Sequence, residues 1–96
     1  MLILVTYDID MTEVSGQKRL RRVAKQCTNF GVRVQNSVFE CQIDAAQYTE
    51  LKHRLLKEID EEKDSIRFYS LGNHYTGKTE HFGVQKGFDL DEPLIM

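Results

Sequence analysis

The sequence predicts an α+β domain in which two helices cover one face of an antiparallel sheet. Short apolar segments that alternate or run continuously indicate strands, and two longer segments with apolar residues every three to four positions indicate helices. A chain of 96 residues can build one hydrophobic core, and its 41% hydrophobic and 29% charged composition is that of an ordinary globular domain. No segment approaches the roughly 18 apolar residues of a membrane span, and no secretory signal is evident, so we expect a cytoplasmic protein.

The first predicted strand begins at Leu2 and places a carboxylate, Asp8, at its end. Strand alternation sends two sets of side chains to opposite faces, and both sets are apolar near the start of the strand. One set is Leu2, Leu4, Thr6 and Asp8, and the other is Ile3, Val5, Tyr7 and Ile9. Because a strand that is apolar on both sides is normally covered on both sides, we expect helices over one face and a second copy of the protein over the other.

A helix and a hairpin follow this strand. Ser15 is the expected N-cap of the helix, and Gly31 is expected in the left-handed position after its end. The apolar stripe of the helix is formed by Leu20, Val23, Ala24 and Cys27. The hairpin turns near Asn36 and Ser37 and sends Phe39, Cys41 and Ile43 inward. Cys27 and Cys41 therefore read as two buried thiols rather than a disulfide or metal site.

A second helix starts at Asp44, which forms a capping box with Gln47. Its apolar stripe is formed by Tyr48, Leu51, Leu55 and Ile59, and residues 60–64 are expected to be its frayed, solvated end. Residues 65–71 form another strand, which gives the order βαββαβ. Right-handed crossovers make this a ferredoxin-like sandwich, joined sheet to sheet as a homodimer. We expect residues 1–73 to be this domain and residues 74–96 to be an extension that docks on the partner subunit, with a short fifth strand at 80–84.

Basic residues are concentrated in one part of the chain. The net charge is −2, yet the segment from residue 14 to residue 39 has no acidic residue. Its cations are Lys18, Arg19, Arg21, Arg22, Lys25 and Arg33. A dimer would double this basic surface, which is suited to the phosphates of nucleic acid. The alternative is that the charges only keep a surface helix hydrated.

Asp8 is the candidate catalytic residue. Its side chain is predicted to face the dimer seam, so the two copies of Asp8 would approach each other across the two-fold axis. Mg²⁺ prefers one or two carboxylates together with water and phosphate oxygens, so this pair is a candidate metal site. Asp10 is either a further ligand or, as we favour, a loop residue, and Asp8 itself could be an ordinary turn or cap residue.

Three segments carry a resemblance to a known family. They are Val5-Thr6-Tyr7-Asp8-Ile9, Leu20-Arg21-Arg22-Val23-Ala24 and Arg33-Val34-Gln35-Asn36-Ser37-Val38-Phe39-Glu40. On these residues the chain resembles the CRISPR-associated protein two family, a small metal-dependent nuclease and adaptation subunit of bacterial immunity systems. The tail, with its Glu80-His81 pair and its Asp91-Glu92-Pro93-Leu94-Ile95 ending, resembles that of subtype C of type I systems.

The resemblance implies a homodimer that binds one Mg²⁺ or Mn²⁺ ion through Asp8 and cleaves RNA or double-stranded DNA. It also implies a complex with the CRISPR integrase subunit during spacer acquisition. Tyr7, Asp8, Arg33 and Phe39 would be catalytic, although Tyr7 and Phe39 also suit core packing. The nucleic acid would contact Lys18, Arg19, Arg22, Arg33 and Ser37. Some members carry a further arginine one turn before Arg22, where this chain has Leu20, with Lys18 or Arg19 as a substitute.

Two other functions remain open at this stage. The same dimer could be a non-catalytic scaffold that holds duplex DNA between integrase subunits, and an Asp8→Asn variant separates this scaffold from an enzyme. A ferredoxin-like RNA-binding or ligand-sensing module is less well supported, because the predicted strands show no exposed pair of aromatic residues on which bases could stack.

Overall fold

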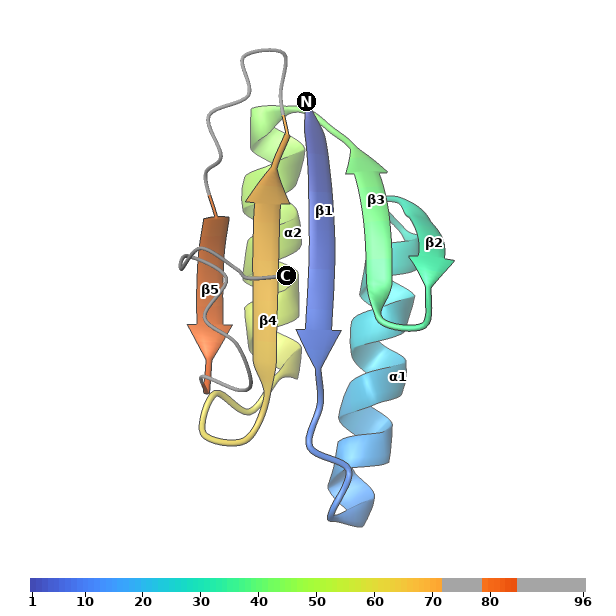
Figure 1. Ribbon diagram of the computed structural model, residues 1–96, viewed down its shortest axis with the longest axis vertical. Coiled ribbons are helices and arrows are strands. Elements are labelled where there is room, and N and C mark those ends of the chain that lie inside the picture. The colour runs from blue at the N-terminus through green and yellow to red at the C-terminus, as the bar shows by residue number, and fades with distance from the viewer. Residues whose placement is uncertain (72–78, 85–96) are drawn as a thin grey trace, which may run out of the picture.

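A computed structural model describes residues 1–71 and 79–84 of the chain. Its elements follow the predicted order, including the short fifth strand at the end (Figure 1). The strands are β1 (Leu2–Asp8), β2 (Val32–Gln35), β3 (Val38–Gln42), β4 (Ser65–Ser70) and β5 (Thr79–Gly83), and the helices are α1 (Val14–Thr28) and α2 (Ala45–Glu58). Among the described residues, no helix is long and apolar enough to cross a membrane.

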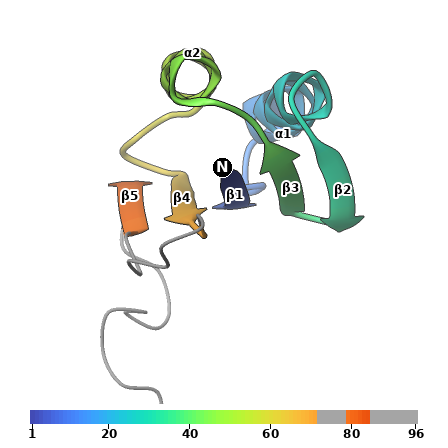
Figure 2. The same cartoon turned by 90° about the horizontal axis from the view of Figure 1, so that it is seen from above.

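The five strands form one antiparallel sheet in the order β2-β3-β1-β4-β5. Both helices pack on the same face of the sheet, as Figure 2 shows from above. This confirms the predicted α+β, ferredoxin-like architecture. We call the other face of the sheet the helix-free face.

The alternation predicted for β1 is confirmed. Ile3, Val5 and Tyr7 are buried in the core under the helices, while Leu2, Leu4 and Thr6 are half-buried and Asp8 is exposed. The core is completed by the predicted stripes of the two helices and by Phe39, Cys41 and Phe68. The end of β1 therefore presents its carboxylate on the helix-free face.

The second helix starts as predicted, and the first does not. The Asp44 side chain accepts a hydrogen bond from the backbone N–H of Gln47, and the Gln47 side chain accepts one from the N–H of Asp44. Helix α1, in contrast, has Glu13 at its N-cap without a side-chain bond, and the predicted cap Ser15 lies inside the helix. The Ser15 hydroxyl accepts a hydrogen bond from the Arg19 side chain, one helical turn later, at 3.1 Å. It therefore does not cap the backbone N–H groups at the start of the helix.

Gly31 has a different role from the one predicted. The C-cap of the helix is Asn29, in the right-handed conformation. Among the described residues only Gly83 has a positive φ, so Gly31 is not in the left-handed position. A Cβ atom on Gly31 would lie 2.3 Å from the carbonyl oxygen of Glu40 and 2.5 Å from the sulfur of Cys41. Glycine is needed here because the chain passes close to β3.

The acidic segment after α2 is not a frayed helix end. Helix α2 stops at Glu58, residues 61–63 form a turn, and Asp64 is fully buried. The Asp64 carboxylate accepts hydrogen bonds from the backbone N–H groups of Asp10 and Asp60 and from the guanidinium of Arg19. The prediction failed because these partners are distant in sequence, and charge alone suggested exposure.

The predicted fifth strand is present, and it pairs with β4 of the same chain. Phe82 packs against the core, and Glu80 bonds to Lys52 and Tyr48 on α2. The expected boundary between residues 73 and 74 falls outside the described residues, as do residues 85–96. Docking of the extension on a partner therefore stays a prediction.

Candidate functional site

Asp8 lies in a small polar cavity on the helix-free face. It is the last residue of β1 and pairs with Ser65, the first residue of β4. The cavity has a volume of about 120 Å³ and is lined by Thr6, Tyr7, Asp8, Ser65 and Arg67. It therefore combines one exposed carboxylate with the two hydroxyl residues Thr6 and Ser65 and the guanidinium of Arg67.

Arg67 is the residue of this cavity that the sequence analysis missed. It pairs with Thr6, one alternation step before Asp8, and the residue is buried, at 8% exposure. Residues diagonal to each other across an antiparallel pair lie within reach of a long side chain, so Arg67 can contact a group held at Asp8. The sequence feature that could have identified it is an arginine between two core residues of a strand, Ile66 and Phe68. Its position next to Asp8 could not be predicted, because it depends on the register between β1 and β4.

Three of the predicted catalytic residues lie on the other side of the sheet. The rings of Tyr7 and Phe39 stack with their centroids 6.3 Å apart, and the Arg33 guanidinium lies 5.1 Å from the centre of the Phe39 ring. Burial raises the pKa of Tyr7, partly offset by its hydrogen bond with Arg33. Tyr7, Phe39 and Arg33 thus form one cluster on the helix-covered face, separate from Asp8.

Ser37 links this cluster to the end of β1 through its backbone. The carbonyl oxygen of Ser37 accepts a hydrogen bond from the N–H of Tyr7 at 3.1 Å, and the Tyr7 hydroxyl donates to the carbonyl oxygen of Asn36 at 3.4 Å. The β2–β3 turn therefore holds the residue that precedes Asp8.

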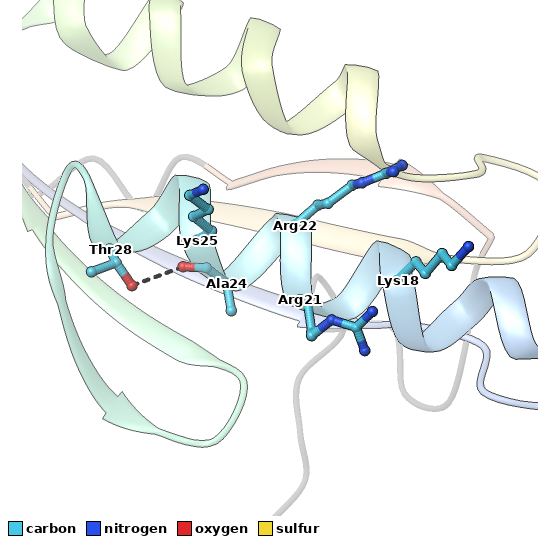
Figure 3. A pocket seen from close by; sticks show the side chains of 6 residues that line it. All are labelled: Lys18, Arg21, Arg22, Ala24, Lys25 and Thr28. Carbon is cyan, nitrogen blue, oxygen red and sulfur yellow. Dashed lines mark hydrogen bonds between the residues drawn. The ribbon is translucent and has the colours of Figure 1, made fainter.

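The exposed surface of α1 carries four cations, which we call the basic face. They are Lys18, Arg21, Arg22 and Lys25, and with Ala24 and Thr28 they border an open depression of about 680 Å³ (Figure 3). All four are exposed, and Lys18 and Lys25 lie about two helical turns apart with Arg21 and Arg22 between them, so they can follow a phosphate backbone. They lie on the helix layer, on the opposite side of the sheet from Asp8.

Arg19 does not belong to the basic face. Its Nε atom donates to Asp64 at 2.7 Å and its Nη2 atom at 3.2 Å, and its side chain is 12% exposed. Its guanidinium is therefore engaged in the interior, which leaves the other cations of α1 as the available phosphate ligands.

Asp8 is the candidate metal ligand, and Asp10 lies in the loop after β1. The Asp10 carboxylate accepts a hydrogen bond from the N–H of Thr12 at 2.9 Å, which closes a short turn. Within the described part of the chain, no three His, Cys, Asp or Glu side chains gather into a metal-binding group. Asp8 alone still fits Mg²⁺ or Mn²⁺, because these ions need only one or two carboxylates when water and phosphate complete the shell.

Comparison with known proteins places this geometry in a family. The family model described as CRISPR associated protein Cas2 matches residues 1–79. The chain is 57% identical over 95 residues to the CRISPR-associated endonuclease Cas2 of Halalkalibacterium halodurans, covering 99% of each chain. It is 52% identical over 96 residues to the CRISPR-associated endoribonuclease Cas2 of Nitratidesulfovibrio vulgaris, covering 100% of this chain and 94% of the relative.

Solved structures agree with this assignment. The crystal structure of Streptococcus pyogenes Cas2 at pH 6.5 superposes with a TM-score of 0.71 and 55% identity, covering 77% of this chain and 89% of that one. Fold, acidic strand end and relatives define the class as a small nuclease built on a ferredoxin-like sheet. The chain belongs to the CRISPR associated protein Cas2 family.

Proposed function

We propose that this chain is a metal-dependent endonuclease that cleaves phosphodiester bonds of RNA or double-stranded DNA at Asp8. The observation that carries the proposal is the placement of the Asp8 carboxylate, exposed at the end of the central strand and beside Arg67 in a polar cavity. Among the described residues the Asp8 side chain has no hydrogen bond or ion pair, so its oxygen atoms are available to a cation.

The protein supplies position and charge to this reaction. Asp8 would hold Mg²⁺ or Mn²⁺, which when bound would polarise the scissile phosphate and lower the pKa of a water molecule. Arg67 would neutralise charge on the phosphate oxygens, since a guanidinium matches a phosphate geometrically. A homodimer joined through the helix-free faces would bring a second Asp8 to the same cleft and supply a second carboxylate.

The basic face would bind the nucleic-acid backbone. Its four cations are exposed, and contacts to phosphate position a duplex or a single strand without reading its sequence. Arg33 is exposed at the edge strand β2 and could extend this surface, while its guanidinium packs over Phe39. We leave Arg19 out of this surface, because its guanidinium forms an ion pair with Asp64.

The biological setting is also a proposal. We propose that the protein acts in the cytoplasm in spacer acquisition, together with the CRISPR integrase subunit, in a subtype C type I system. A second candidate is the non-catalytic DNA scaffold. The basic face and Asp8 lie on opposite sides of the sheet, and this separation favours the scaffold, because duplex binding at the basic face would not require cleavage at Asp8.

Replacement of Asp8 tests the enzyme against the scaffold. Asp8→Asn should abolish cleavage of labelled RNA and duplex DNA oligonucleotides with MgCl₂, while their binding in EDTA stays within about twofold of the parent. Asp10→Asn is the matched control, because an asparagine oxygen can still accept the Thr12 N–H, and it should cleave at the parent rate. Equal cleavage by Asp8→Asn and parent, with both purified free of nuclease contamination, would refute the enzyme and leave the scaffold.

A further inference from the structure

A serine and a histidine meet beside Asp8 on the helix-free face. Ser65 pairs with Asp8 across β1 and β4, and His81 pairs with Arg67 across β4 and β5. The Nε2 atom of His81 lies 3.0 Å from the Ser65 hydroxyl oxygen and 2.9 Å from the carbonyl oxygen of Val84. Three strands therefore contribute to one polar cluster around the cavity.

The carbonyl of Val84 determines which group donates. A carbonyl oxygen can only accept a hydrogen bond, so Nε2 of His81 must carry the proton. The same N–H group then donates to two acceptors, the Val84 carbonyl oxygen and the Ser65 hydroxyl oxygen. It follows that Nε2 cannot remove a proton from Ser65, and that His81 does not activate Ser65 as a nucleophile.

The Ser65 hydroxyl keeps its own proton for another acceptor. Among residues 1–71 and 79–84, His81 is its one hydrogen-bond partner. Ser65 is buried, at 6% exposure, and it lines the cavity that Asp8 and Arg67 also line. A cavity of about 120 Å³ is several times the roughly 15 Å³ that one water molecule needs, so a phosphate oxygen can enter it.

We infer that Ser65 donates a hydrogen bond to a phosphate oxygen of the nucleic acid bound at Asp8, and that His81 is a positioning residue that orients this hydroxyl. The inference rests on the proposed function, since it assumes a phosphodiester held at Asp8. The chemistry is favourable because a hydrogen bond to a charged acceptor is about twice as strong as a neutral one. A donor held by another side chain also loses little freedom on binding.

The competing explanation is structural, with the Ser65–His81 bond serving only to join β5 to β4. The two explanations differ in how the residues depend on each other. If His81 acts through the hydroxyl, its replacement has no further effect on nucleic-acid binding once the hydroxyl is removed. If it acts on the fold, the two losses add.

The test measures binding in CaCl₂, a divalent cation that also takes carboxylate and phosphate oxygens, and cleavage in MgCl₂, with labelled RNA and duplex DNA oligonucleotides. Ser65→Ala should weaken binding and lower kcat/KM by the same factor, roughly 10- to 100-fold, the range for a hydrogen bond to a charged group. His81→Ala should lose about three- to tenfold, and His81→Gln, which keeps an N–H donor, should stay within about threefold of the parent. The double variant Ser65→Ala, His81→Ala should match Ser65→Ala alone.

Ser70→Ala is the matched control, because it makes the same change at the other end of β4 and should bind as the parent does. Melting temperatures identify variants that fail to fold, and His81→Gln remains informative if His81→Ala is unstable. Unchanged binding by Ser65→Ala, or additive losses in the double variant, would overturn the inference. Equal cleavage by Asp8→Asn and parent would instead refute the nuclease, and the CaCl₂ binding series would still decide the role of Ser65.

Discussion

Replacement of Asp64 by asparagine should destabilise the protein strongly, although it changes almost no volume. One carboxylate oxygen accepts from the Asp10 N–H at 2.9 Å and from Arg19 at 3.2 Å. The other accepts from Arg19 at 2.7 Å and from the Asp60 N–H at 2.8 Å. An asparagine keeps one of these oxygens and turns an NH₂ group toward two donors, so two charge-assisted bonds are lost.

The expected cost follows from these contacts. Hydrogen bonds to charged groups contribute about 1.5–3 kcal/mol each, so the loss of two amounts to roughly 3–6 kcal/mol. This is a large share of the 5–15 kcal/mol that stabilises a typical domain. At about 4–8 °C per kcal/mol, the melting temperature should fall by more than about 10 °C. Cleavage should fall too, because Asp64 holds the backbone of Asp10 and immediately precedes Ser65.

The pH dependence provides a second signature. Burial tends to raise the pKa of Asp64, but the Arg19 guanidinium and the two backbone N–H groups outweigh it and hold the pKa below its usual value. A carboxyl with a lowered pKa in the folded state stabilises the protein above its unfolded pKa of about 3.9. This stability is lost as the pH falls through the folded pKa. The difference between parent and Asp64→Asn should therefore be full at pH 7 and shrink below about pH 4.

Urea denaturation at fixed protein concentration measures both effects. Asp60→Asn is the matched control, because within residues 1–71 and 79–84 its side chain accepts only the exposed N–H of Glu62, and asparagine can do the same. It should change the free energy of unfolding by less than about 0.5 kcal/mol. If Asp64→Asn were as stable as Asp60→Asn at pH 7, the reasoning about this buried carboxylate would be refuted.

Three further outcomes are expected. Gly83→Ala should destabilise the folded protein by more than about 2 kcal/mol, because φ is +96° and a Cβ would lie 2.0 Å from the Asp64 carbonyl oxygen. A melting temperature equal to that of the parent would contradict this. Burial raises the pKa of Cys27 to about 12 and of Cys41 to about 11, so iodoacetamide at pH 8 should label them only after denaturation, as mass spectrometry would show. Replacing the four cations of the basic face with glutamine should make the plot of log affinity against log salt concentration less steep, by about 0.9 for each lost contact to duplex DNA. Lys57→Gln on α2 is the control and should leave this slope unchanged.

The parts of the fold that were predictable depend on neighbours in sequence. The capping box of Asp44 and Gln47, the turn at Asn36 and Ser37 and the alternation along β1 each involve residues a few positions apart, and each is confirmed. The start of α1 was missed because Ser15 bonds to a side chain instead of the helix N-terminus. Gly31 was misread because the neighbour that requires a glycine is on β3.

Asp64 and Arg19 show the limit of reading charge from sequence. A run of acidic residues normally indicates a solvated surface, and an arginine on a basic helix normally indicates a phosphate ligand. Here the two side chains form an ion pair at 2.7 Å between positions 45 residues apart, which removes both from the surface. The packing of α1 against the segment after α2 produces this ion pair, and no local sequence pattern predicts it.

The sequence by itself determined that Asp8 ends a central strand and points away from the helices, because strand alternation is a property of the backbone alone. The tertiary structure decided the neighbours of Asp8. The register of β1, β4 and β5 brings Ser65, Arg67 and His81 to its side and leaves Tyr7, Phe39 and Arg33 on the opposite face. Register is set by the packing of a shared core between segments far apart in the chain, so the composition of the site emerges only when those strands are assembled.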